Sequence, residues 1–355
     1  MQITCNTQAL SAELRILSKI APTKASIQIL SHVLLKADDR LTLYSTDLEV
    51  GLRTTCAARI EAPGTVALPL ARLSDIVDQL PDGDIVITLD GKQAKIVSGA
   101  YKSRLQALPA DEFPALPEVE GVSSYLDARA FRQMIDRTRY AIAATGDRYL
   151  LQGALLTLAG PAAAMVATDG KRLALTTMAR AGTDANVIIP VKTLDVLSSH
   201  AGAEDIELTV GENHLFFVQG TRLLTSRVID GKFPNYQRII PKDNHKTATV
   251  DRAALAAVLR RIGLASEQNL SVTMAFSSGE LLVSSRSAEF GEAEEPMTIT
   301  YDAEPLTLCV NWRYVLDFLD AAEGQTISIA MKDEKSALLL SDGEAFVNVI
   351  MTMRS

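Results

Sequence analysis

The stretch Ala167-Thr168-Asp169-Gly170-Lys171-Arg172-Leu173-Ala174-Leu175 lies near the middle of the 355-residue chain. Thr-Asp-Gly is typical of a tight turn, because the Asp side chain hydrogen-bonds the local backbone and Gly adopts a positive φ at little steric cost. The residues at 161–166 are mostly small and apolar, and the residues after the turn alternate between leucine and smaller or polar side chains. We therefore expect a strand on either side of the turn.

The turn belongs to a unit that occurs three times. Helix-like segments that open with Pro69, Pro190 and Asn311 are spaced by 121 residues (190 minus 69, and 311 minus 190). Strands that open with isoleucine at positions 85, 206 and 327 keep the same spacing. Such a constant register predicts three copies of one structural unit. The six predicted helices lie at 7–20, 69–80, 127–142, 190–200, 251–266 and 311–322.

Alternating segments separate the two helices of each unit, at 33–56, 151–179 and 270–301. Each segment predicts two or three antiparallel strands. Thr7, Asp127 and Asp251 are expected to cap the first helix of each unit. The fold class is therefore α+β, with three similar domains in which two helices pack on antiparallel sheets. We expect these domains at 1–119, 120–243 and 244–355, joined by proline-rich or polar linkers at 113–121 and 241–245.

Composition indicates a globular protein, with 47% hydrophobic and 22% charged residues. Cys5, Cys56 and Cys309 form no CxxC pair, which argues against a disulfide framework or a zinc site. We see no signal peptide and no apolar run of membrane-spanning length, so the expected location is cytoplasmic, without membrane association. The net charge of −8 disfavours indiscriminate binding of nucleic acid.

The first helix of each unit is nevertheless locally basic. Formal charges are +1 for 7–20, +2 for 127–140 and +2 for 251–263, counting Lys and Arg against Asp and Glu. One such helix is usually solvated surface. Three at equivalent positions favour a shared basic face that meets a polyanion.

Several motifs, in order along the whole chain, resemble the bacterial beta sliding clamp, the processivity subunit of DNA polymerase III. They are Ser45-Thr46-Asp47-Leu48-Glu49, the stretch at 167–174, Asp230-Gly231-Lys232-Phe233-Pro234-Asn235-Tyr236-Gln237-Arg238-Ile239-Ile240-Pro241, Asn311-Trp312-Arg313-Tyr314-Val315-Leu316-Asp317, and Met351-Thr352-Met353-Arg354-Ser355. The resemblance implies three clamp domains per chain and two chains per closed ring, with helices around a central hole and sheets outside. Residues 102–108 of one chain are then expected to meet the third domain, including Leu264, of the other.

The same resemblance implies a non-catalytic function. The homodimeric ring would encircle double-stranded DNA without sequence preference and confer processivity in DNA replication. Its partners would be the DNA polymerase III catalytic subunit, the clamp loader, and other polymerases and repair proteins, each binding through a short clamp-binding peptide. No cofactor, metal or catalytic residue is expected.

The resemblance also carries site residues onto this chain. The partner-binding cleft between the second and third domains is expected to comprise Leu151, Thr168, Gly170, Lys171, Arg172, Leu173, Pro234, Arg238, Ile239, Val349, Ile350, Met351, Met353 and Arg354, with Arg172 and Arg238 at its rim. The residues expected to face DNA are Lys24, Arg148, Tyr149 and Lys192.

The chain departs from the family pattern at several positions. Thr352 stands in place of a frequent proline, Ser355 in place of a terminal leucine, and Lys171 in place of a frequent histidine. Ala144-Thr145 stands where residues with more hydrogen-bonding capacity can occur. These departures leave open a specialised second-copy clamp with altered partner affinity.

Two other classes of protein compete with a clamp. A protein-only scaffold would share the repeat but would not require basic residues in all three first helices. An enzyme is disfavoured, because the four histidines form no HExxH motif and no P-loop or nucleophile-elbow motif occurs in a strand-to-helix context.

Overall fold

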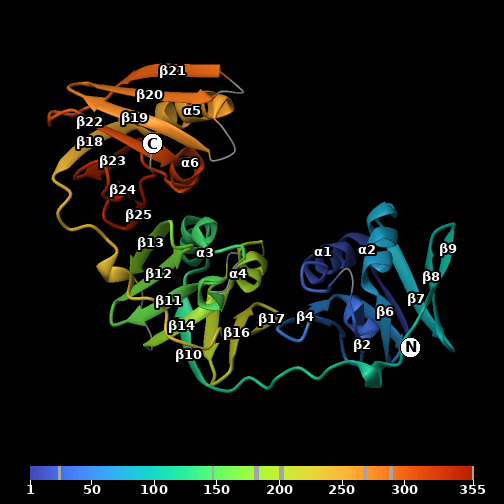
Figure 1. Cartoon of the computed structure of the whole chain (residues 1–355). Coiled ribbons are helices and arrows are strands. Elements are labelled where there is room, and N and C mark those ends of the chain that lie inside the picture. Colours follow the sequence, from blue (N-terminus) through green and yellow to red (C-terminus); the bar gives the residue numbers. More distant parts are fainter. Residues whose placement is uncertain are drawn as a thin grey trace. The chain divides into compact units, whose positions relative to one another are not determined.

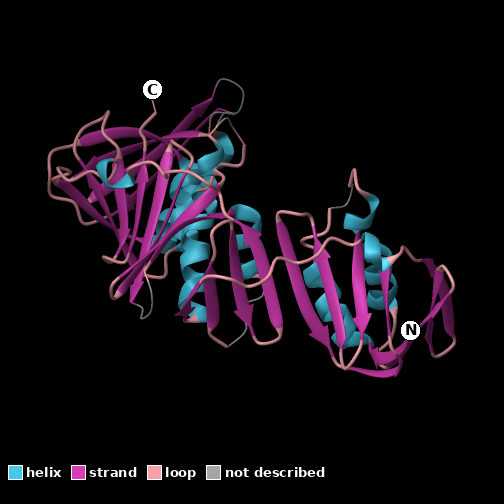
Figure 2. Cartoon of the chain, turned by 90° about the horizontal axis from the view of Figure 1, so that it is seen from below, coloured by secondary structure: helices cyan, strands magenta, loops and turns pink. Residues whose placement is uncertain are grey.

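The computed structural model describes residues 1–22, 25–145, 148–179, 184–199, 204–266, 270–287 and 291–353. The chain divides into two compact units, whose elements are labelled in Figure 1. Unit 1 comprises Met1–Arg129 and Lys192–Val228, and unit 2 comprises Ala130–Arg180, Asp184–Val191 and Ile229–Ser355. Within each unit, helices pack against antiparallel sheets (Figure 2).

Unit 1 contains two antiparallel sheets. The smaller has the order β5-β1-β7-β8-β9, with β1 (Gln2–Asn6), β5 (Ala58–Ala62), β7 (Asp84–Asp90), β8 (Gln93–Ser98) and β9 (Tyr101–Gln106). The larger has the order β10-β15-β16-β17-β4-β3-β2-β6, with β2 (His32–Ala37), β3 (Leu41–Thr46), β4 (Val50–Cys56), β6 (Gly64–Pro69), β10 (Val122–Leu126), β15 (Ile206–Val210), β16 (His214–Gln219) and β17 (Arg222–Arg227).

Helices α1 (Thr7–Leu17) and α2 (Leu70–Gln79) pack together in unit 1 through apolar residues at helical spacing. Leu10, Leu14 and Leu17 of α1 are fully buried. Asn6, and not Thr7, caps this helix, since its side chain accepts hydrogen bonds from the backbone of Gln8 and Ala9. The predicted cap was one residue late because Thr7 donates its hydroxyl elsewhere, to the backbone oxygen of Pro81.

Unit 2 repeats this plan. Its larger sheet has the order β14-β11-β12-β13-β25-β24-β23-β18, with β11 (Gly153–Ala159), β12 (Ala162–Thr168), β13 (Arg172–Ala179), β14 (Ala185–Pro190), β18 (Lys246–Asp251), β23 (Thr326–Met331), β24 (Leu338–Asp342) and β25 (Phe346–Ile350). The smaller has the order β21-β20-β19-β22, with β19 (Ser271–Ser277), β20 (Glu280–Ser287), β21 (Gly291–Thr298) and β22 (Leu306–Asn311).

The remaining predicted helices are α3 (Ala128–Thr138), α4 (Val191–Ser198), α5 (Arg252–Ile262) and α6 (Trp312–Ala321). The predicted cap Asp251 is confirmed, since its carboxylate accepts a hydrogen bond from the backbone of Ala254 at 2.8 Å. Between α5 and α6 lies a large apolar core, in which the rings of Phe318 and Phe346 lie 4.8 Å apart. Among the described helices, none is both long and apolar enough to cross a membrane.

Each eight-stranded sheet combines four strands from one sequence repeat with four from the next. In unit 1, β4 of the first repeat pairs with β17 of the second. In unit 2, β13 of the second repeat pairs with β25 of the third. The compact units therefore cut across the repeats, because strands of successive repeats join in one hydrogen-bonded sheet. The exact bounds of the three domains stay a prediction.

Candidate partner-binding cleft

The central turn forms as expected between β12 and β13. The Thr168 hydroxyl donates to the backbone oxygen of Arg172 at 2.6 Å and accepts from the backbone N–H of Gly170 at 3.1 Å. One carboxylate oxygen of Asp169 accepts from the backbone N–H groups of Lys171 and Arg172, at 2.8 and 3.0 Å. Gly170 has a φ of +88°, which explains the glycine at this position. The turn thus fixes where β13 begins.

An apolar cluster lies beside this turn, and we call it the cleft cluster. Leu173 of β13 pairs with Val349 of β25, and both side chains are buried, with 1% of their surface exposed. Leu151, in the short 3-10 helix η4 (Tyr149–Leu151), joins them at 3% exposed. The cleft cluster consists of Leu151, Leu155, Val166, Leu173, Ile188, Ile229, Phe233 and Val349. These side chains provide an apolar floor without buried charge.

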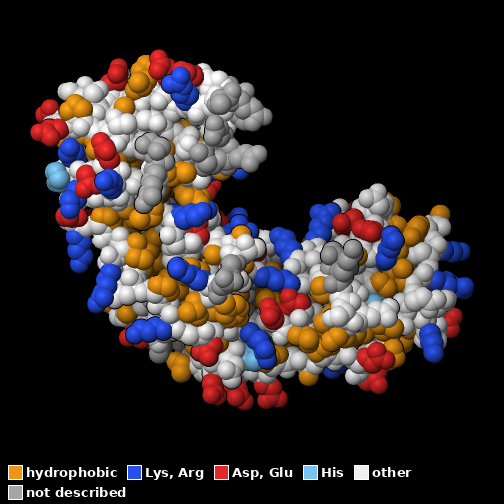
Figure 3. Space-filling view, viewed as in Figure 1, with side chains coloured by type: hydrophobic (Ala, Val, Ile, Leu, Met, Phe, Trp, Pro, Cys, Tyr) orange, Lys and Arg blue, Asp and Glu red, His pale blue; other side chains and the backbone are white. Residues whose placement is uncertain are grey.

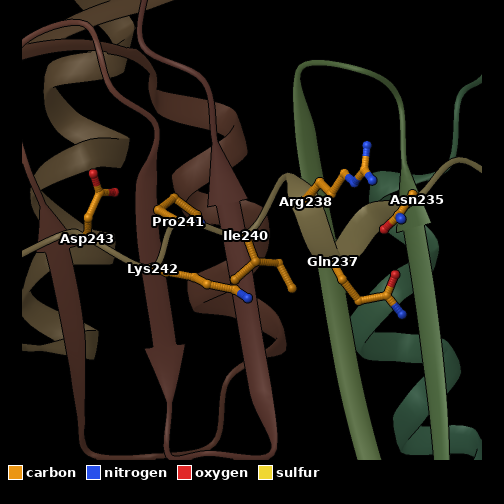
Figure 4. A pocket seen from close by; sticks show the side chains of 7 residues that line it. All are labelled: Asn235, Gln237, Arg238, Ile240, Pro241, Lys242 and Asp243. Carbon is orange, nitrogen blue, oxygen red and sulfur yellow. The ribbon is translucent and has the colours of Figure 1, made fainter.

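The segment that follows Phe233 bears a polar groove. The groove has a volume of about 560 Å³ and is lined by Asn235, Gln237, Arg238, Ile240, Pro241, Lys242 and Asp243. Figure 4 shows the Arg238 and Gln237 side chains extending in different directions from the segment. Tyr236 and Ile240, only partly buried, pack against the cleft cluster. The groove therefore adjoins the apolar floor and supplies it with exposed polar groups.

Arg172 has a different environment from the rim position that the sequence predicted. Its side chain is only 11% exposed and forms ion pairs with Asp169, at 3.1 Å, and with Asp317 of α6. Its guanidinium also donates to the backbone oxygen of Tyr140 and lies over the rings of Tyr140 and Tyr314, 5.3 and 4.4 Å from their centroids. With its donors engaged within unit 2, Arg172 joins the turn to α6.

A second polar pair lies next to this arginine. Asn348 of β25 is fully buried and donates its amide to the hydroxyl of Tyr140 at 2.5 Å. Burial raises the pKa of Tyr140, so the phenol remains protonated. The two residues tie the short 3-10 helix η3 (Arg139–Ala141) to the terminal strand.

Backbone hydrogen bonds hold the C-terminal segment in place. The N–H of Met351 donates to the oxygen of Lys171 at 2.9 Å, and the N–H of Met353 donates to the oxygen of Cys309 at 2.7 Å. The Met351 side chain is 46% exposed. A half-exposed methionine bonded to the central turn can contact an incoming apolar group, because its side chain is flexible and polarizable.

The structure brings Leu151, Thr168, Gly170, Leu173 and Val349 together, as the resemblance implied. Ile350 packs instead into the core between α5 and α6, because successive strand residues face opposite sides of a sheet. Lys171, Pro234, Arg238 and Ile239 are exposed around the floor, and Met353 is partly buried. Arg354 lies outside the described residues. The role of all these residues in binding stays a prediction.

The residues expected to face DNA have varied environments. Arg148 and Tyr149 are exposed, the latter at 57%. Lys192 donates to the backbone oxygen of Ile20 at 2.7 Å and forms an ion pair with Asp47, so its charge is already compensated within unit 1. Lys24 lies outside the described residues.

Arginines of the basic helices are also paired. Arg15 of α1 contacts Asp78 of α2 at 3.2 Å, and Arg260 of α5 contacts Asp320 of α6 at 2.5 Å. On the face that Figure 3 shows, Lys and Arg side chains are interspersed with Asp and Glu. The local basic charge read from the sequence is therefore partly compensated by the neighbouring helix.

Sequence reasoning missed the partners of Arg172. Asp317 and Tyr314 belong to the Asn311–Asp317 motif, so a signal for them existed, but the motif alone did not indicate which residue they contact. Tyr140 carried no signal of its own beyond helical spacing. Among the described residues, no cluster of three or more His, Cys, Asp or Glu side chains could hold a metal ion.

Comparison with known families accounts for the repeat. Three models of the DNA polymerase III beta subunit match in order: the N-terminal domain over residues 1–117, the central domain over 125–235 and the C-terminal domain over 237–354. The chain belongs to the DNA polymerase III beta subunit family. The predicted resemblance and fold class, three clamp domains of helices on antiparallel sheets, are thereby confirmed.

Several known proteins are similar to this chain over its full length or nearly so. The beta sliding clamp of Caulobacter vibrioides is 35% identical over 359 residues, which cover 96% of each chain. That of Pseudomonas aeruginosa is 31% identical over 372 residues, with both chains covered completely. The crystal structure of the Pseudomonas aeruginosa subunit matches with a TM-score of 0.94 and 29% identity over all of both chains. The function of this chain is accordingly that of a DNA sliding clamp.

Proposed function

We propose that two copies of this chain form a closed ring around duplex DNA and tether DNA polymerase III and other replication and repair proteins to it. The protein would act in the cytoplasm, without catalysis. Membership of the beta subunit family is the observation that carries the proposal. A tether needs no reactive group, since processivity follows from topological linkage alone.

Complementary charges on two edge strands support the dimer. Strand β9, at one edge of the smaller sheet in unit 1, exposes Lys102 and Arg104. Strand β21, at one edge of the smaller sheet in unit 2, exposes Glu292 and Glu294. Unpaired sheet edges tend to acquire a partner, and opposite charges favour pairing between β9 of one chain and β21 of the other. Leu264, 83% exposed, supplies an apolar contact for that interface.

The cleft cluster would bind the short peptides of partner proteins. A Gln-x-x-Leu-Phe-like peptide can place its apolar side chains on Leu173, Val349 and the residues around them. Arg238 and Gln237 would then hold backbone or carboxylate oxygens of the peptide. A related structure from Bartonella birtlesii, 30% identical with a TM-score of 0.95, is described as bound to griselimycin. That description agrees with a ligand site on a protein of this fold.

Contact with DNA would be weak and independent of sequence. Arg148 and Tyr149 remain exposed for phosphate or sugar, whereas Lys192 is engaged by Asp47. Phosphate contacts position a protein on the duplex without reading bases. Intramolecular pairing of helix arginines lowers the attraction further, which suits a protein that slides.

Thr352 and Lys171 favour a second possibility, a specialised clamp copy with altered partner affinity. Proline at 352 would restrict the segment between the two fixed N–H groups of Met351 and Met353, and threonine does not. The difference concerns the strength of peptide binding and leaves the ring unchanged.

Retention on circular DNA tests the proposed function. The protein is loaded with a clamp loader onto nicked circular DNA and separated from free protein by gel filtration. We expect it to co-elute with the circle and to be released when a restriction enzyme linearises the DNA. Release that does not depend on linearisation would contradict topological linkage.

A further inference from the structure

The first repeat contains a second copy of the central turn. The Thr46 hydroxyl donates to the backbone oxygen of Val50 at 3.0 Å and accepts from the N–H of Leu48 at 3.0 Å. One oxygen of Asp47 accepts from the N–H groups of Glu49 and Val50, at 2.9 and 2.7 Å. These are the four hydrogen bonds of the turn at 168–172, displaced by 122 residues (168 minus 46). Leu48 even adopts the positive φ of Gly170, at +79°.

The apolar floor beside the turn is also duplicated, and we call this copy the first-repeat cluster. It consists of Ile29, Leu30, Tyr44, Ala67 and Phe113, lies wholly in unit 1, and is 0 to 8% exposed. Ile29, Tyr44 and Phe113 correspond to Leu151, Val166 and Phe233 at offsets of 122, 122 and 120 residues. A strand of the following repeat pairs beside each turn: Thr225 of β17 pairs with Gly51, as Val349 pairs with Leu173, although Thr225 is polar and Val349 apolar.

The two floors differ in the side chains next to the turn. Gly51 stands at the position of Leu173, and a Cβ added to Gly51 would lie 3.2 Å from the Tyr44 hydroxyl. The Tyr44 ring therefore occupies room that the leucine side chain takes in the other copy. The ring packs edge-on against Phe113, with 5.2 Å between the centroids. These two rings are thus in contact within the first-repeat cluster.

Exposed apolar residues precede and follow residues of both clusters in the sequence, at matching offsets. Ile27 and Val119 of the first repeat are 51% and 48% exposed. Their counterparts Tyr149 and Ile239, at offsets of 122 and 120, are 57% and 41% exposed. Such a combination of apolar floor and half-exposed apolar rim marks interaction surfaces.

The charges around the two floors are opposite in sign. Exposed Glu49, Glu112 and Glu118 stand 122, 120 and 120 residues before Lys171, Lys232 and Arg238 in the sequence. The first-repeat floor has two opposing changes. Exposed Arg227 stands at the position of Met351, and the Arg227 N–H donates to the oxygen of Glu49 as the Met351 N–H does to that of Lys171. Exposed Arg53, directly opposite Tyr44, stands 122 residues before Leu175, which packs against the cleft cluster. Three carboxylates against two guanidinium groups still leave these positions with a net negative charge.

We propose that the first-repeat cluster is a second docking surface, for short apolar peptides flanked by lysine or arginine. The occupant follows from charge complementarity, since a basic peptide is attracted to the three glutamates and an acidic one is repelled. The surface does not depend on ring closure or on the peptide specificity of the cleft cluster. Each chain then offers two docking surfaces that discriminate between partners by charge.

Calorimetric titration of two synthetic peptides tests this. Both carry a central Leu-Phe pair, one flanked by lysines and the other by glutamates. Replacing Ile27 and Val119 by Ser, which removes apolar contact without adding charge, should weaken binding of the lysine peptide at least tenfold. The matched control replaces the equivalent Tyr149 and Ile239 by Ser and should leave that peptide unaffected. All four positions are half-exposed, so the variants are expected to fold, which circular dichroism verifies.

Charge reversal supplies an independent readout. Replacing Glu49, Glu112 and Glu118 by Lys should abolish the preference of the first-repeat surface for the lysine peptide and weaken that binding at least tenfold. The proposal is overturned if the lysine peptide shows no saturable binding to the unmodified protein. It is also overturned if that binding responds to the control variant alone, which would locate the peptide at the cleft cluster.

Discussion

At the scale of single residues, Arg172 joins the central turn to α6 and to the short helix η3. Its guanidinium meets two carboxylates, a backbone oxygen and two aromatic rings. Replacing it by Ala should lower the free energy of unfolding of unit 2 by about 3 kcal/mol, because Asp169 and Tyr140 lose a largely buried cation. Urea unfolding followed by near-UV circular dichroism measures this change.

Two variants control for this effect. Arg172→Lys should restore little, since an ammonium cannot reproduce the planar contacts with two rings. Arg260→Ala removes an exposed ion pair with Asp320 and should change the free energy of unfolding by less than about 1 kcal/mol. If Arg172→Ala and Arg260→Ala lower the free energy of unfolding equally, the buried contacts of Arg172 do not stabilise unit 2 beyond an exposed ion pair.

His32 gives a pH dependence at the same scale. Its ring is 4% exposed and Nδ1 hydrogen-bonds the backbone oxygen of Gln28 at 3.1 Å. Burial lowers the pKa of His32 below its ordinary value of 6.5, so between these two pKa values the unfolded chain binds the proton more readily. The contribution of His32 to stability is complete above pH 6.5. It is lost as the pH falls from 6.5 to the lower pKa of the folded state. His32→Asn should flatten the decline in thermal midpoint between about pH 7 and pH 5; parallel curves would contradict this.

At the scale of elements, we expect the segment after β25 to set the affinity of the cleft for partner peptides. Thr352 lies between two residues whose N–H groups are fixed to Lys171 and Cys309. Thr352→Pro should stabilise the bound conformation by about 0.4–1 kcal/mol, because proline restricts the unbound segment. We expect tighter binding of a Gln-x-x-Leu-Phe-like peptide in calorimetry, by a factor of about two to five.

Two further variants separate the conformational restriction by proline from the loss of the threonine hydroxyl. Thr352→Ala removes the hydroxyl while retaining the N–H and should leave affinity near that of the unmodified chain. Deletion of residues 351–355 should abolish peptide binding, since Met351 and the backbone bond to the turn are lost. Undiminished binding by the truncated chain would place the peptide site elsewhere.

At the scale of the whole molecule, β9 and β21 should decide assembly. In the proposed dimer, reversing Lys102 and Arg104 to Glu would place like charges opposite Glu292 and Glu294, so this variant should be monomeric. Reversing Glu292 and Glu294 to Lys in the same chain should restore the dimer. Light scattering at micromolar concentration measures both. A dimer that persists in the first variant, or monomers of the unmodified protein, would exclude this interface.

The sequence by itself determined the repeat, the six helices and the central turn. These features depend on local chemistry: helical spacing around Leu10 and Leu14, the Asp169 carboxylate within reach of its own turn, and a glycine where φ is positive. It also determined the family, because several motifs keep their order and spacing. The apolar positions Leu151, Leu173 and Val349 followed from that family resemblance.

Only the tertiary structure decided which distant groups meet. Asp317 is 145 residues from Arg172, and no local pattern indicates that contact. Lys192 likewise forms an ion pair with Asp47, so its charge is compensated. Ile350 packs into the core that contains α5 and α6, whereas its neighbour Val349 belongs to the cleft cluster. The pairing of β4 with β17 likewise brings Thr225 beside Gly51. Such contacts depend on strand partners and sheet faces, which the chain acquires only when sheets from successive repeats join.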